Sequence, residues 1–103
     1  MLELLHMSKN TIMKNLLRNK KSLSDFTVKN IGLFGSFATG TNKKNSDLDF
    51  VVEFNDKTFD NYIGLKLFLE QQFKRPVDLV MPNTIKPSLK QAILKQVVYV
   101  KGL

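Results

Sequence analysis

Residues 31–52, IGLFGSFATGTNKKNSDLDFVV, hold the pattern from which the fold can be worked out. An apolar, β-favouring run over Phe26–Phe34 stops at Gly35, and a segment rich in Thr, Asn and Lys fills Ser36–Ser46. The run Asp47–Phe54 then alternates, with Leu48, Phe50, Val52 and Phe54 on one face and Asp47, Asp49, Val51 and Glu53 on the other. This period of two predicts a strand with one face in the core and the other facing solvent or a site.

Helical and extended patterns alternate along the rest of the chain. Apolar residues at helical spacing predict a helix of about three turns from Ser8 and further helices near 58–73 and 87–97. A polar spacer, 20–25, precedes the first strand, and the apolar run 77–81 predicts a third strand. No repeat or linker divides the sequence. We therefore expect a small α+β (α/β) fold in one domain over residues 1–103.

Composition limits the chemistry that is available. The chain has 103 residues, no Cys and one His, which excludes disulfides, thiolate zinc sites, cysteine nucleophiles and His-rich metal clusters. A hydrophobic fraction of 43% with 24% charged residues is typical of a folded globular protein. Any reaction must therefore use carboxylates, hydroxyls, lysines and backbone groups.

The net charge of +7 raises the question of nucleic-acid binding. The sequence holds no helix-turn-helix or RNP-type motif and no interleaving of aromatic and basic residues, so we expect no direct nucleic-acid binding. No apolar run is long enough to cross a membrane, and Met1–His6 is too short and too acidic for a signal peptide. These features predict a soluble, cytoplasmic protein without a membrane partner.

Three carboxylates form the most informative candidate site. Asp47 and Asp49 leave the same face of one predicted strand, and Asp78 lies in the middle of an apolar strand, where a buried charge needs a partner. Magnesium prefers such oxygen ligands and is often shared with substrate phosphates. If the third strand lies beside the second, three carboxylates could hold two Mg²⁺ ions for phosphoryl transfer.

The Gly35-Ser36 pair predicts the complementary half of this site. A glycine at a strand end lets the backbone approach a ligand closely, and the first turn of a helix presents free N–H groups to phosphate. The Ser36 hydroxyl adds one more donor.

With these residues in view, Gly35-Ser36-Phe-Ala-Thr39-Gly40 followed by Ser46-Asp47-Leu-Asp49 resembles the signature of the minimal nucleotidyltransferases (MNT) of the DNA-polymerase-β-like superfamily. The resemblance covers residues 26–81 and implies a small mixed β-sheet with helices packed on one face. It implies that Gly35 and Ser36, with Thr39 and Ser46, bind the nucleotide triphosphate. Asp47 and Asp49 would ligate two Mg²⁺ ions, and Asp78 would complete the metal site and help to deprotonate the acceptor hydroxyl.

The same resemblance implies a partner and an activity. Small MNT proteins are often paired with helical HEPN toxins, which they neutralise as antitoxins, in characterised cases by adenylylating a tyrosine of the toxin. We therefore expect a magnesium-dependent transfer of AMP from ATP to a hydroxyl of a HEPN partner in a hetero-complex.

One position departs from the family pattern. The family usually has Arg before the second glycine of the motif, where this chain has Thr39, and a single hydroxyl replaces a fixed charge with five donors. Lys43 or Lys44 could supply the charge. Alternatively, catalysis is weakened and the protein neutralises its partner by binding.

Overall fold

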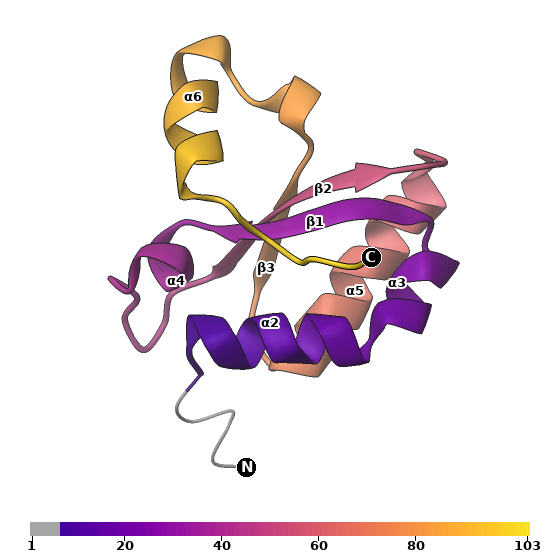
Figure 1. Cartoon of the computed structure of the whole chain (residues 1–103), viewed down its shortest axis with the longest axis horizontal. Helices are drawn as coiled ribbons and strands as arrows, with labels where there is room; N and C mark the ends of the chain where they lie inside the picture. Colours follow the sequence, from indigo (N-terminus) through magenta and orange to yellow (C-terminus); the bar gives the residue numbers. More distant parts are fainter. Residues whose placement is uncertain (1–6) are drawn as a thin grey trace.

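The computed structural model describes residues 7–103 (Figure 1), so Met1–His6 lies outside the described residues. The elements are, in order, α2 Lys9–Arg18, α3 Lys20–Asp25, β1 Val28–Phe34, α4 Ser36–Thr39, β2 Leu48–Phe54, α5 Phe59–Phe73, β3 Val77–Val80, the 3₁₀-helix η1 Pro82–Thr84, α6 Pro87–Gln96 and β4 Val98–Tyr99. None of the helices in this described part has the length and apolar character needed to cross a membrane. The single-domain expectation for residues 1–103 stays a prediction.

The strands form one mixed sheet in the order β3-β2-β1-β4. β1 is antiparallel to both β2 and β4, whereas β2 and β3 are parallel. Parallel neighbours need a crossover connection, which α5 provides between β2 and β3. The expected α+β class and mixed sheet are confirmed.

One face of the sheet carries the hydrophobic core. Leu48, Phe50 and Val52 of β2 are fully buried there, as the period of two predicts. They pack with apolar residues of the other strands and of α2, α3 and α5, among them Ile12, Leu16, Leu23, Ile31, Leu33, Leu65, Leu69, Phe73, Val77 and Leu79. The helix α6 stands apart from α2 and α5 in Figure 1 and contributes no buried residue. The face that bears the carboxylates is therefore free of the main helical layer.

The structure differs from the sequence-based expectation at several places; β2, for example, begins at Leu48, so that Asp47 lies just before the strand. The polar spacer 20–25 forms a second short helix, α3, because Leu23 inserts into the core. The first strand begins at Val28 rather than Phe26, since Thr27 adopts a left-handed conformation (φ 61°) and its hydroxyl donates to Asp56 O at 3.0 Å. A fourth strand, β4, follows α6, pairs with β1 and forms the other edge of the sheet.

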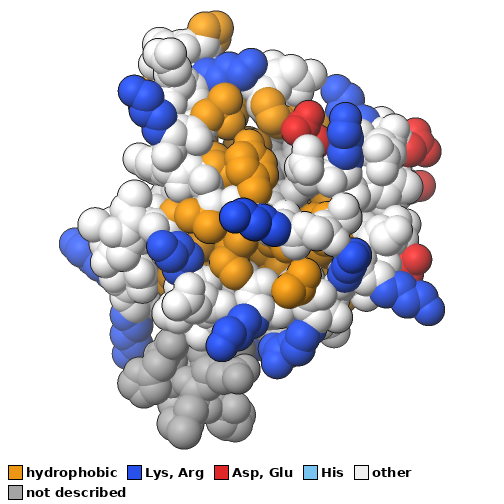
Figure 2. All heavy atoms as spheres, in the orientation of Figure 1, with side chains coloured by type: hydrophobic (Ala, Val, Ile, Leu, Met, Phe, Trp, Pro, Cys, Tyr) orange, Lys and Arg blue, Asp and Glu red, His pale blue; other side chains and the backbone are white. Residues whose placement is uncertain are grey.

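Charged side chains are unevenly placed on the face seen in Figure 2. Lys and Arg side chains are scattered over much of it, whereas the visible Asp and Glu side chains lie in its right half. Apolar side chains gather in the middle of this face, below α6. On this face, the basic side chains are therefore spread out rather than gathered into one stripe.

Candidate active site

Asp49 and Asp78 lie side by side on neighbouring parallel strands. They are register partners of β2 and β3, so their side chains leave the same face of the sheet. Their neighbours in sequence, Phe50 and Leu79, point into the core on the opposite face. Asp78 is exposed and Asp49 is half-buried. The third strand does lie beside the second, which is the condition that the sequence left open, and this pairing brings the two carboxylates together.

Electrostatics link the third carboxylate to this pair. Burial, followed by the negative charges of Asp78 and then of Asp47, raises the pKa of Asp49 from 3.8 to about 6. Asp47 lies on the segment just before β2 and is exposed. The charges of Asp78 and Asp47 therefore both act on the Asp49 carboxylate, where a cation would relieve the repulsion.

The oxygen donors of these carboxylates are of the type that magnesium prefers, but the protein side chains alone do not complete its coordination shell. Within residues 7–103, no group of three or more His, Cys, Asp or Glu side chains is gathered closely enough to hold a metal ion. Magnesium typically takes one or two carboxylates and completes its shell with water and substrate phosphates. The in-register pair Asp49 and Asp78 supplies that number of carboxylates. These carboxylates could hold the ion with water and nucleotide phosphates completing its shell.

Gly35 fixes the backbone beside this pair. It ends β1 with φ 77° and ψ −155°, a conformation essentially restricted to glycine. A Cβ at this position would overlap Oδ2 of Asp49. The chain then enters α4 at Ser36. Gly35 is therefore required both for the turn and for the close approach of the backbone to the Asp49 carboxylate.

Thr39 and Ser46, the two other hydroxyls expected to bind nucleotide, make local hydrogen bonds. Thr39 Oγ1 donates to Gly35 O at 3.2 Å and lies 2.9 Å from Thr41 Oγ1. Ser46 Oγ accepts a hydrogen bond from the backbone N–H of Lys43 at 2.8 Å. Both hydroxyls stabilise the loop between α4 and β2. Their roles toward a nucleotide stay predictions.

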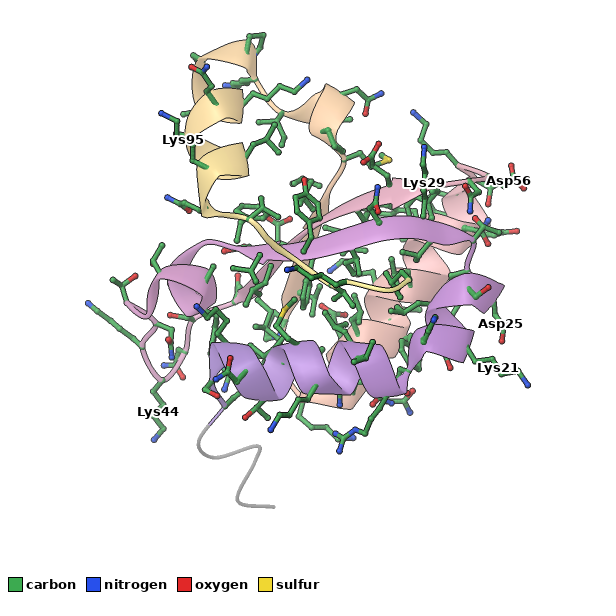
Figure 3. All side chains as sticks on the ribbon, in the orientation of Figure 1. Lys21, Asp25, Lys29, Lys44, Asp56 and Lys95 are labelled. Atoms are coloured by element: carbon green, nitrogen blue, oxygen red, sulfur yellow. The ribbon has the colours of Figure 1, made fainter. Side chains whose placement is uncertain are left out.

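The two lysines of this loop are exposed. Figure 3 shows Lys44 projecting from the loop away from the body of the protein. Lys44 also lines a pocket of about 350 Å³, together with Asn45, Ser46, Lys74, Arg75 and Pro76. The pocket carries three cationic side chains beside the loop that leads to Asp47. Whether Lys43 or Lys44 replaces the missing arginine stays a prediction.

Sequence reasoning missed the contacts by which α5 holds β3. Lys66 Nζ donates to Val77 O at 2.8 Å, and Glu70 Oε2 accepts from Val77 N at 3.0 Å. Lys66 and Glu70 also pair with each other at 3.1 Å. The backbone N–H of Val77, and next the ammonium of Lys66, lower the pKa of Glu70. The i, i+4 spacing of Lys66 and Glu70 was the available signal, but it gave no hint that Val77 lies between them.

Tyr62 adds a third contact from α5 to the same edge strand. Its hydroxyl donates to Leu79 O at 2.9 Å. Because β3 is the outer strand of the sheet, these contacts satisfy backbone groups that would otherwise face solvent. These contacts hold the backbone of Val77 and Leu79, the two neighbours of Asp78. They therefore fix the position of the Asp78 backbone along the edge of the sheet.

We expect Tyr62→Phe to lower the melting temperature. The change removes one partly buried hydrogen bond, worth about 1 kcal/mol, which corresponds to about 4–8 °C in a domain of this size. Thermal unfolding by circular dichroism measures it. Tyr99→Phe is the matched control, because Tyr99, the other tyrosine of the chain, is 42% exposed. Equal melting temperatures for the wild type and Tyr62→Phe would contradict the assigned contact.

The family is settled by comparison with known proteins. The model of the nucleotidyltransferase domain family matches residues 13–100. This chain belongs to that family. A relative from Thermococcus cleftensis, the protein adenylyltransferase MntA, is 38% identical over 87 residues, which make up 82% of this chain and 88% of the relative. The expected nucleotidyltransferase is thus confirmed at the level of the family.

Solved nucleotidyltransferase structures share the fold. One, described as a minimal nucleotidyltransferase, matches with a TM-score of 0.76 and 28% identity, over 90% of this chain and 96% of that chain. A toxin–antitoxin structure with AMP-PNP matches at 0.68 and 29%, over 86% and 74%. A complex of tri-AMPylated HEPN toxin with MNT antitoxin from Shewanella oneidensis matches at 0.60 and 25%, over 86% and 71%. The resemblance to minimal nucleotidyltransferases is confirmed.

Proposed function

We propose that this protein is a magnesium-dependent adenylyltransferase that moves AMP from ATP to a tyrosine hydroxyl of a HEPN-type partner and acts as its antitoxin. The observation that carries the proposal is the in-register pair Asp49 and Asp78 beside the glycine turn at Gly35. The adenylyltransferase relative and the AMPylated toxin complex support the choice of nucleotide and partner. We also place the activity in one cytoplasmic domain.

Each residue has a distinct part in this proposal. The turn at Gly35 and Ser36 binds the triphosphate through backbone N–H groups and a hydroxyl, with Thr39 and Ser46 shaping the adjoining loop. Asp47, Asp49 and Asp78 would hold two magnesium ions. When bound, these ions neutralise the charge on the phosphates and polarise the phosphorus that is attacked.

The reaction balances without a further reactant. The acceptor oxygen forms a bond to the α-phosphorus of ATP, the bond between that phosphorus and the α,β-bridging oxygen breaks, and pyrophosphate leaves with the bridging oxygen. Asp78 takes the proton of the acceptor hydroxyl. It is suited to this step because it is exposed on the carboxylate face, while its neighbours Val77 and Leu79 are held by α5.

Transfer of label distinguishes this reaction from its alternatives. We expect label from [α-³²P]ATP to appear on the HEPN-type partner protein, and label from [γ-³²P]ATP to stay off it. A Tyr→Phe change at the modified position of the partner should abolish labelling. Label from the γ-phosphate, or transfer undiminished by Asp47→Asn with Asp49→Asn, would overturn the proposal.

Thr39 favours a second candidate, neutralisation by binding alone. Its hydroxyl is engaged with Gly35 O and Thr41 and offers no charge in place of the usual arginine. In that case the Asp47→Asn, Asp49→Asn double variant would still protect cells from the partner. Loss of protection together with retained complex formation supports catalysis instead.

A further inference from the structure

We propose that Arg75 is a positioning residue that locks together the three segments of the catalytic site. This inference rests on the nucleotidyltransferase function proposed above and assigns a residue that the sequence did not single out for it. Arg75 lies in the short connection between α5 and β3, three residues before Asp78. Its contacts reach the two other segments of the site.

The first contact holds the segment that leads to Asp47. The Nη1 of Arg75 donates to Ser46 O at 3.0 Å. Ser46 directly precedes Asp47, and its hydroxyl accepts from Lys43 N. On the other side of Asp47, Leu48 donates its backbone N–H to Pro76 O at 3.1 Å. The chain before β2 and the chain before β3 are therefore fastened to each other on both sides of Asp47.

The second contact holds the turn that follows Gly35. The guanidinium of Arg75 lies over the ring of Phe37, with its central carbon 5.0 Å from the ring centroid. Phe37 is the second residue of α4, next to Ser36, and is only 3% exposed. A cation over an aromatic face is attractive. Arg75 thus ties α4 to the strand that carries Asp78.

The geometry requires an arginine rather than a positive charge alone. A planar guanidinium can stack on a ring with its face while donating from its edge, whereas the ammonium of lysine cannot do both. Arg75 Nε is buried without a hydrogen-bond partner in the described structure, which costs free energy. The contacts with Phe37 and Ser46 O are the interactions that the described structure gives this side chain.

The alternative is a general attraction of phosphate by the basic pocket. Lys44 and Lys74 line the same pocket as Arg75, and a purely electrostatic effect would be retained by lysine and screened by salt. A positioning effect would be lost in Arg75→Lys and would not depend on salt. Lys74→Asn is the matched control, because it removes a neighbouring charge and asparagine tolerates the left-handed conformation of that residue (φ 55°).

The test measures binding of Mg²⁺ with AMP-PNP by calorimetry at 50 and 500 mM NaCl, using the whole chain. We expect Arg75→Lys and Arg75→Ala to weaken binding by about 10- to 100-fold at both salt concentrations, as for other groups that orient metal ligands. Lys74→Asn should match the wild type at 500 mM NaCl. Amide NMR spectra of ligand-free Arg75→Lys should show shifts at Phe37, Ser46 and Asp47 with the remaining spectrum intact.

The outcomes separate this inference from the function on which it rests. Wild-type affinity in Arg75→Lys, or a loss that disappears at 500 mM NaCl, overturns the positioning role alone. Absence of binding by the wild type overturns the proposed function and this inference with it. Because Arg75→Lys is the mildest change, it decides the matter even if Arg75→Ala fails to fold.

Discussion

Asp49→Asn is expected to raise the melting temperature of the free protein while lowering adenylyl transfer by at least about 100-fold. The asparagine keeps the size of the side chain but removes a charge that is half-buried and repelled by Asp78 and Asp47. Relief of this repulsion stabilises the fold. Loss of the carboxylate removes a group that would hold magnesium against the triphosphate.

The stability gain should depend on pH with a definite sign. Because the pKa of Asp49 rises from 3.8 to about 6 in the folded protein, the protonated form stabilises the fold. That stabilisation is fully present below pH 3.8 and is lost as the pH rises through 6. Solvent screening at this half-exposed group limits the loss to about 1 kcal/mol. The gain of Asp49→Asn over the wild type should therefore appear above pH 6 and vanish below about pH 4.

Melting curves between pH 3.5 and 8, together with the label-transfer assay, measure both effects. Asp56→Asn is the matched control, since Asp56 lies in the loop beyond the far end of β2 and is exposed (Figure 3). Mg²⁺ with AMP-PNP should raise the melting temperature of the wild type and of Asp56→Asn by mass action, but not that of Asp49→Asn. A melting temperature of Asp49→Asn that stays below the wild type at pH 8 would contradict the repulsion argument.

Gly35→Ala is expected to destabilise the protein and to abolish nucleotide binding. Its backbone conformation costs a non-glycine residue about 1–3 kcal/mol, and the added methyl group would overlap Oδ2 of Asp49. The carboxylate must then move or the turn must open. Either response separates the phosphate-binding turn from the carboxylate pair.

Gly40→Ala provides the control for backbone strain. Gly40 also has a positive φ, 78°, yet a Cβ there meets nothing within 4 Å. Gly40→Ala should cost only about 1 kcal/mol and leave binding of Mg²⁺ with AMP-PNP intact. Chemical denaturation and calorimetry on both variants check this. Similar binding by Gly35→Ala and Gly40→Ala would show that the overlap with Asp49 is not what makes Gly35 necessary.

Local pattern was sufficient for much of this site. The alternation in Asp47–Phe54 placed Leu48, Phe50 and Val52 in the core and Asp49 on the opposite face. This works because successive side chains of a strand point to opposite faces whatever the neighbouring strands are. The glycine turn after the first strand was equally visible, since few residues can end a strand with such a backbone.

Local patterns in the chain therefore predicted β1, β2 and β3 and the residue types available for chemistry. Only the tertiary structure placed Asp78 opposite Asp49 and Arg75 between Phe37 and Ser46. It also revealed β4 and the contacts of α5 with the edge strand β3. The direction in which a side chain leaves a strand is set by the local backbone, so it can be predicted from a short stretch of sequence. Strand order, register and burial depend on packing between segments that are far apart in the chain, so they cannot.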